Sequence, residues 1–195
     1  MEEIHAYEPE RHSMMNGQVL PCDYTFEEAR LVMHEMAEAS VLELVEKGLA
    51  TESISLSVGY ARPPRADAAE GAAGMGQSSR RRSWQARTGG CRKIERLTNS
   101  RRTLLAAFDA LFDDTTRRDT PIRRLTLGFG GLVPERYAPV TLFDDVTADE
   151  EERSLQHAIV SVRDRFGKNA LLKAASLSEK ATARERNNQV GGHHA

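Results

Sequence analysis

The sequence predicts an α+β fold, in which a small sheet of about four strands carries two helices on one face and is followed by a C-terminal helix and a flexible tail. Apolar residues recur at helical spacing in two segments and alternate with polar residues in two others. Both helices would bury their apolar stripes on the same face of the sheet. With 195 residues and 39% hydrophobic content, the chain can form one domain plus extensions.

The first predicted elements are a short strand and a long helix. The strand is the apolar run at residues 18–20. Thr25 and Glu28 have the spacing of a capping box, which predicts that a helix begins after Thr25. Apolar residues then repeat at helical spacing as far as Gly48, a residue type that commonly ends helices.

The middle of the chain combines a clear strand with an irregular connection. Residues 53–60 alternate between apolar and small residues, which predicts a strand with one buried face and one small, polar face. Residues 61–90 are rich in Gly, Ala, Pro, Ser and Arg, and we expect a disordered loop. Residues 92–97 predict a further strand, although their apolar positions alternate poorly.

A second helix, a last strand and a third helix follow. Thr98 or Ser100 is expected to cap the second helix, and the last strand at residues 125–129 is expected to end at Gly130 and Gly131. Thr147 and Glu150 form another candidate capping box before an amphipathic helix at 149–167. The polar tail at 168–195 is expected to be largely disordered.

Charge is distributed unevenly along the chain. The net charge is only −2, but residues 62–102 are rich in arginine and residues 144–152 are acidic. Such separation is typical of a nucleic-acid binder with a solvated back face, and it is equally typical of soluble arginine-rich loops. The sequence has no apolar run near the ~20 residues of a membrane span and no signal peptide, so we expect a cytoplasmic protein with no membrane partner and two unpaired cysteines.

Enzyme chemistry finds little support in the sequence. The glycine-rich run at 128–131 lacks the Lys-Ser/Thr pair of a phosphate loop, and His193 and His194 have no partners at metal-ligand spacing. We find no set of nucleophile, base and orienting residue. We therefore expect no cofactor, metal or small-molecule substrate on this chain.

Nucleic-acid binding is better supported, because cationic and hydroxyl side chains gather near three predicted elements. They flank the strand at 92–97, begin the second helix and precede the last strand: Arg92, Lys93, Arg96, Ser100, Arg101, Arg102, Arg123 and Arg124. Free N–H groups and the helix dipole favour a phosphate at a helix N-terminus. If the sheet forms as predicted, these groups could converge on one edge.

Two runs carry a resemblance to a known family. Residues 17–30, GQVLPCDYTFEEAR, and the tail from Phe166 onward resemble the C-terminal third of Y-family translesion DNA polymerases, the DinB/UmuC group. The resemblance implies that residues 1–16 are a linker from a thumb domain and that residues 17–132 are the little finger. In that family this domain of four strands and two helices holds duplex DNA by its phosphates in the major groove.

The resemblance also implies roles for individual residues. Thr98, Ser100 and Arg101 fit the turn before the family's second helix, and Arg123 and Arg124 fit its basic last strand. DNA is therefore the expected partner, in DNA repair by translesion synthesis. The palm and fingers, which would hold Mg²⁺ for nucleotidyl transfer, are missing from this sequence, so we expect no polymerase activity from the chain alone.

A linker at residues 133–148 contains a candidate clamp-binding peptide. Its sequence around Leu142 and Phe143 resembles the short peptide with which such polymerases dock on the sliding clamp. Pro139 occupies the position of the family's glutamine, which should weaken docking. The alternative function is thus a protein-interaction fragment that docks on the clamp or on another repair factor, with DNA contact incidental.

Overall fold

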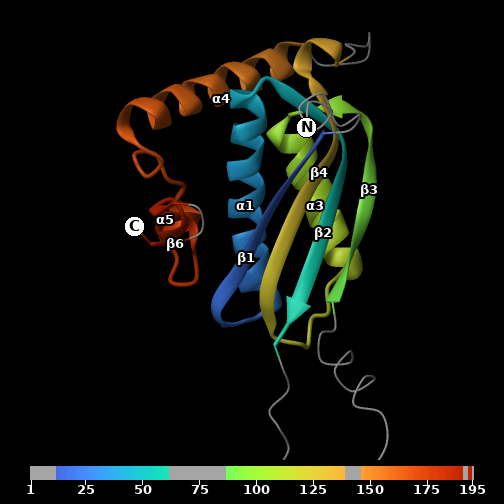
Figure 1. Ribbon diagram of the computed structural model, residues 1–195, viewed down its shortest axis with the longest axis vertical. Coiled ribbons are helices and arrows are strands. Elements are labelled where there is room, and N and C mark those ends of the chain that lie inside the picture. The colour runs from blue at the N-terminus through green and yellow to red at the C-terminus, as the bar shows by residue number, and fades with distance from the viewer. Residues whose placement is uncertain (1–11, 62–86, 139–145, 191–192, 195) are drawn as a thin grey trace, which may run out of the picture.

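The computed structural model describes residues 12–61, 87–138, 146–190 and 193–194. One sheet and two helices form two layers, and a third long helix and the C-terminal tail pack beside them (Figure 1). The elements in chain order are β1 (His12–Tyr24), α1 (Phe26–Glu46), β2 (Leu49–Tyr60), β3 (Arg87–Thr98), α3 (Arg101–Thr115), β4 (Ile122–Pro134), η2 (Glu135–Tyr137), α4 (Val146–Phe166), η3 (Ala174–Leu177), α5 (Ala183–Arg186), β5 (Gln189–Val190) and β6 (His193–His194).

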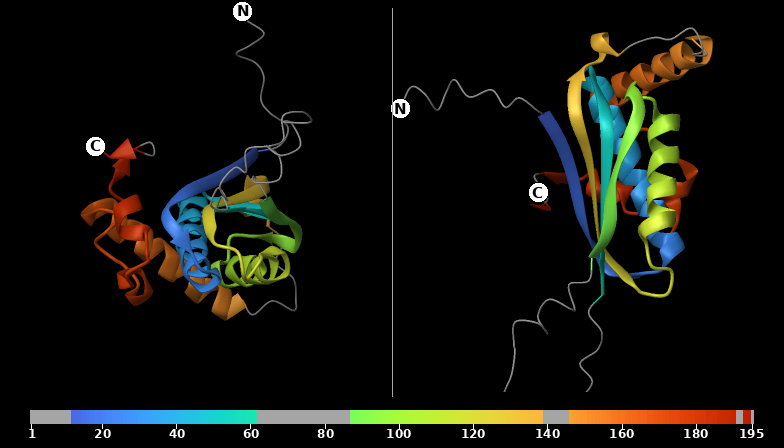
Figure 2. Two further views of the ribbon diagram at one scale, coloured as in Figure 1. Left: turned by 90° about the horizontal axis from the view of Figure 1, so that it is seen from below. Right: turned by 90° about the vertical axis from the view of Figure 1, so that its right-hand side faces the viewer.

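The main sheet has the strand order β1-β4-β2-β3, and its neighbouring strands are antiparallel. This confirms the predicted α+β fold of four strands with two helices on one face (Figure 2). The strands are longer than their apolar runs. In particular, β4 does not end at Gly130 and Gly131 as predicted, because Gly130 pairs with Ser53 and the ladder to β2 continues as far as Pro134.

The prediction of a disordered loop at 61–90 is wrong for the C-terminal end of that segment. Residues 87–90 belong to β3 and pair with β2, while residues 62–86 lie outside the described residues. Gly89 has a φ of 135°, and a Cβ atom there would collide with the backbone at Leu56. Only glycine tolerates both this φ and so close an approach to the Leu56 backbone. Glycine in the sequence suggested a loop, but at this position it is what allows β3 to pair with β2.

The predicted helix caps are largely confirmed. The Thr25 hydroxyl accepts a hydrogen bond from the Glu28 N–H, and the Glu28 carboxylate accepts one from the Thr25 N–H at 2.8 Å. That backbone bond lowers the pKa of the Glu28 carboxyl. Ser100 caps α3 by accepting from the Thr103 N–H at 3.3 Å, whereas the Thr98 hydroxyl accepts from the Ser100 N–H.

The core lies between the sheet and the helices α1 and α3. The apolar positions of β2 and β4 face the helices and are buried, as are the apolar stripes of both helices. Phe108 of α3 and Phe129 of β4 meet edge to face with ring centroids 5.4 Å apart. No helix of the described chain covers the opposite face of the sheet (Figure 2).

The third predicted helix forms, but its expected capping box is wrong. Helix α4 already begins at Val146, so Thr147 lies inside it and cannot be its N-cap. The helix is amphipathic in sequence, and the side chains of Leu155 and Phe166 are 62% and 66% exposed. Helix α4 contacts α1 and runs across the end of that helix (Figure 1).

The tail was expected to be disordered, yet residues 167–190 follow a defined path along α1. The carboxylate of Glu35, which is only 6% exposed, accepts hydrogen bonds from the backbone N–H groups of Thr182 (2.8 Å) and Ala183 (3.0 Å). Arg186 donates to the side-chain oxygen of Gln18 and to the Glu35 carbonyl, both at 3.1 Å. Charge-assisted hydrogen bonds therefore hold a segment that has few apolar residues.

Replacing Glu35 by leucine should release the tail. The variant leaves two buried N–H donors without their acceptor, and each charge-assisted bond is worth ~1.5–3 kcal/mol. We expect amide hydrogen exchange of residues 168–190 to accelerate about tenfold or more, with little change in β2 and β4. Glu46→Leu, at an exposed position of the same helix, is the control. Unchanged exchange in the tail of the Glu35 variant would contradict this account of tail docking.

Candidate nucleic-acid interface

The helix-free side of the sheet, here called the open face, carries two exposed arginines in one row. Gly59 of β2 pairs with Arg124 of β4 on one side and with Arg87 of β3 on the other, and Val19 of β1 continues the row beyond Arg124. Because side chains alternate along a strand, residues that pair in register point to the same face. The fold therefore places two guanidinium groups on either side of a residue that has no side chain.

Small residues make the centre of the open face flat. On β2 it is formed by Ser53, Ser55 and Ser57, the small polar face expected from the alternating pattern. Their partners on β4 are Gly130, Gly128 and Thr126. A Cβ atom at Gly128 would collide with the Ser55 hydroxyl, so the two strands leave no room for larger side chains at this point.

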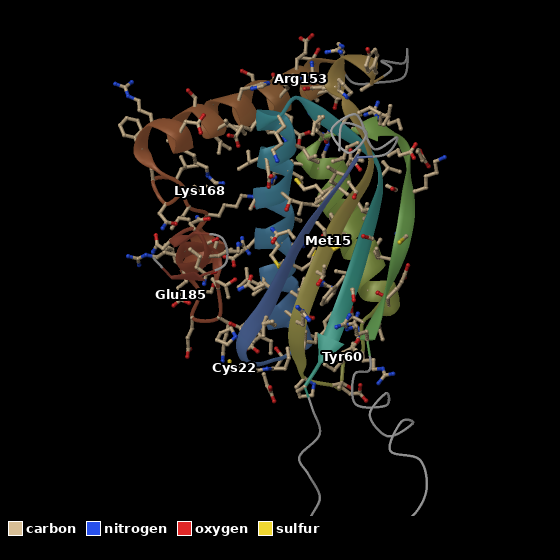
Figure 3. All side chains as sticks on the ribbon, in the orientation of Figure 1. Met15, Cys22, Tyr60, Arg153, Lys168 and Glu185 are labelled. Atoms are coloured by element: carbon tan, nitrogen blue, oxygen red, sulfur yellow. The ribbon has the colours of Figure 1, made fainter. Side chains whose placement is uncertain are left out.

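The rim of the open face is cationic and partly apolar. Lys93 of β3 is exposed and pairs with Ser53, so it points to the same side as Arg87 and Arg124. Met15 on β1, labelled in Figure 3, is 74% exposed on this face. Glu95 is an exposed acidic residue two positions after Lys93, so the row of Arg87 and Arg124 lies at the more basic end.

Other predicted site residues point elsewhere. Arg92 pairs with Ile54, a core residue, so it faces the helix layer, where its Nη2 lies 2.7 Å from an oxygen of Asp114 at the end of α3. Arg123 lies at an irregularity of β4, with its Nε 3.7 Å from Asp23. Neither guanidinium extends the cationic row of the open face.

The N-terminus of α3, where the sequence predicts a phosphate, holds a carboxylate from α4. Glu152 accepts hydrogen bonds from the Ser100 hydroxyl at 2.8 Å and from the Arg102 N–H at 3.0 Å. Asp149 lies 3.4 Å from Arg96 and 3.5 Å from Arg102. A phosphate at this helix end would have to displace two acidic side chains of the same chain.

Two further predicted residues are engaged within the fold. Arg101 donates from Nη2 to Glu38 of α1 at 2.6 Å, and Lys173 of the tail contacts the same carboxylate. Thr98 is 8% exposed and pairs with Thr51. The structure thus divides the predicted set: Lys93 and Arg124 lie on the open face, while most of the others contact side chains of this chain.

Sequence reasoning missed Arg87 because it lies in the segment predicted to be a loop. The available signal was its spacing from Ile94: the two residues are seven positions apart, an odd number, so they fall on opposite faces of a continuous strand. The clamp-peptide residues Leu142 and Phe143, and Pro139 beside them, lie outside the described residues.

Metal-binding and membrane features were sought in the described ranges. No group of three or more His, Cys, Asp or Glu side chains there could hold a metal ion. The helices of that part of the chain include none that is long and apolar enough to span a bilayer.

Comparisons with known proteins agree with the fold. The model of the impB/mucB/samB family C-terminal domain matches residues 11–142. DNA polymerase IV 2 of Bacillus subtilis (strain 168) is 31% identical over 102 residues, which are 52% of this chain and 24% of that protein. The chain thus spans about a quarter of the length of that relative.

A solved structure is also similar, a complex of the beta-clamp processivity factor and the little finger domain of PolIV. The match covers 68% of this chain and 100% of that chain, with 14% sequence identity and a TM-score of 0.40. Because the family model covers most of the chain, including all four strands of the main sheet, the protein belongs to the impB/mucB/samB family and contains its C-terminal domain, the little finger of Y-family DNA polymerases.

Proposed function

We propose that this chain is the DNA-binding part of a Y-family polymerase that acts in translesion synthesis, and that it holds DNA phosphates on the open face. The observation that carries the proposal is the row in which Arg124 and Arg87 flank Gly59. Between two cations, a residue without a side chain lets a phosphate backbone come close to the strand. Catalytic bond formation would belong to protein outside this chain.

The distribution of ion pairs favours the open face over the helix layer. On the helix side, arginines have carboxylate partners within the fold, such as Arg92 with Asp114 and Arg101 with Glu38. Within the described residues, Lys93, Arg87 and Arg124 have no ion pair. Unpaired cations gain most from an external polyanion, because no internal pair has to be broken.

Such contacts would fix DNA without reading its sequence. Arginine and lysine bound to phosphates position a protein on the duplex, and the counterions that they release make binding depend on salt. A polymerase that copies past lesions needs DNA contacts that do not depend on sequence, since the template can carry any sequence. We therefore expect affinity for primer–template DNA to be insensitive to sequence and to fall steeply with salt.

Arg124→Ala should weaken binding to all DNA sequences alike. We expect about a tenfold loss of affinity, with the slope of log affinity against log salt reduced by about 0.9, the value for one phosphate contact. Fluorescence anisotropy with two unrelated primer–templates at several salt concentrations measures both. Arg118→Ala, an equal charge change on the helix side, is the control. Loss on one sequence alone would contradict phosphate binding.

A bulky side chain in the middle of the open face should also block DNA. Ser57→Tyr places a ring between Thr126 and Gly89, where it would keep the sugar-phosphate backbone of DNA away from the open face. Tyrosine is favourable in strands, so we expect an unchanged melting temperature. We expect affinity to fall about tenfold or more as several phosphate contacts are lost. Ala106→Tyr, on the exposed side of α3, is the matched control, and equal effects of both variants would exclude the open face.

We also propose that the peptide at 139–143 docks on the sliding clamp, from its resemblance to the clamp-binding peptide of Y-family polymerases. Two apolar anchors on a short segment can fill a preformed groove. Replacing both Leu142 and Phe143 by alanine should abolish clamp binding in surface plasmon resonance and leave DNA affinity unchanged. Loss of DNA affinity together with clamp affinity would instead assign these side chains to the fold.

A further inference from the structure

The C-terminal tail forms one wall of a pocket beside the edge strand β1. The pocket has a volume of about 990 Å³ and lies among β1, α1, α4 and the tail. Figure 2 shows the β5–β6 hairpin reaching past the edge of the sheet toward the side of the open face. Gly17 and Val19 of β1 line the pocket and also belong to the open face, so the two surfaces are continuous.

Two arginines from different elements converge in this pocket. Arg163 comes from α4 and Arg186 from α5. Burial lowers the pKa of both guanidinium groups. The negative charge of Glu38 opposes this shift at Arg163 and that of Glu35 opposes it at Arg186, whereas the charge of Arg163 lowers the pKa of Arg186 further. Neither group has an ion pair with any residue that the structure describes. Two desolvated like charges close together favour an anion between or beside them.

The two arginines differ in how far they are satisfied. Arg186 is fixed by its bonds to Gln18 and to the Glu35 carbonyl. The Nε of Arg163 is buried without a hydrogen-bond partner in the described part of the chain. A buried N–H donor that lacks an acceptor costs free energy, so Arg163 is the less satisfied of the two arginines. Its guanidinium would have to turn toward the pocket for a phosphate oxygen to accept from this N–H.

The remaining lining suits a nucleotide rather than a bare ion. Amide side chains from both walls line the pocket: Asn16, Gln18, Asn187 and Gln189. The amide nitrogens of Asn16 and Asn187 and the amide oxygen of Gln18 already bond within the chain, and the other amide atoms of these side chains remain to donate to or accept from a base edge. Lys168, labelled in Figure 3 at the turn after α4, adds a third cation. Of the acidic lining residues, Glu43 is engaged by Lys47 at 2.5 Å, and Glu46 and Asp164 are exposed.

We propose that this pocket binds a nucleotide of a single strand that leaves the duplex held on the open face, with its phosphate at Arg163. This inference rests on the proposed function. A strand crossing the row of Arg124 passes Val19 and enters the pocket directly. The walls formed by β1 and the tail on either side favour one strand over a double helix. The C-terminal extension would thus lengthen the nucleic-acid path beyond the four-stranded sheet.

The test measures the affinity of the full chain for two DNA probes. One is a blunt duplex, and the other is the same duplex with a single-stranded extension of about twelve nucleotides. Arg163→Met keeps the aliphatic stem and removes the guanidinium. We expect about a tenfold loss of affinity for the extended probe, the effect of one charge-assisted phosphate contact, and less than about twofold for the blunt duplex. Arg165→Met, an equal charge change at an exposed position of the same helix, should alter neither affinity.

A second variant covers the case in which Arg163→Met fails to fold. Val160 lines the same pocket, and Val160→Glu would place a carboxylate where the phosphate should bind, with the same selective loss expected for the extended probe. If Arg163→Met and Arg165→Met behave alike, the pocket does not bind the strand. If thymidine triphosphate alone competes as well as the extended DNA, the ligand is a free nucleotide and the strand assignment is wrong.

The failure of this inference is distinguishable from failure of the proposed function. An effect of Arg124→Ala on both probes without any effect of Arg163→Met would leave DNA binding on the open face intact and overturn only the pocket. Absence of binding to either probe by the unmodified chain would overturn both.

Discussion

The fold depends on one constraint, the alternation of side chains along four antiparallel strands whose register is fixed by a core on one side only. Apolar residues of β2 and β4 must face α1 and α3, and a register slip of one residue would turn them to solvent. The same register determines which residues lie on the other face. Ser57 and Gly59 are therefore placed on the open face by the packing of Val58 between them.

Charge follows the same division into two faces. Arginines on the helix side meet carboxylates from neighbouring elements, and the acidic start of α4 occupies the N-terminus of α3. On the open face the described cations have no such partners. A chain with a net charge of only −2 can thus present a cationic surface, because its acidic residues are used on the other side. The net charge alone does not indicate this cationic surface.

The sequence predicted the elements whose signals are local and missed those that depend on distant contacts. The capping box at Thr25 and the alternation of β2 involve neighbours in the chain, and both are confirmed. The start of β3 contains Gly89 and Gly90, which disfavour strands, and it forms because β2 offers an edge to pair with. Docking of the tail depends on Glu35, whose partner Thr182 is 147 residues away. The candidate site divides likewise: Arg124 follows from a strong strand, whereas Arg87 depends on the pairing of β3 with β2, and its spacing from Ile94 is a signal only once the strand is known to be continuous.

The buried carboxylate of Glu35 makes the C-terminal extension part of the same folded unit as the family domain. The family match ends at residue 142, but Thr182 and Ala183 satisfy an acidic side chain of α1 inside that match. Without the tail, Glu35 would face an uncovered helix surface and Arg186 would no longer bridge β1 and α1. The extension therefore supports the edge strand β1, which joins the open face to the pocket. A strand of DNA that follows this surface would contact residues of the extension immediately after those of the sheet.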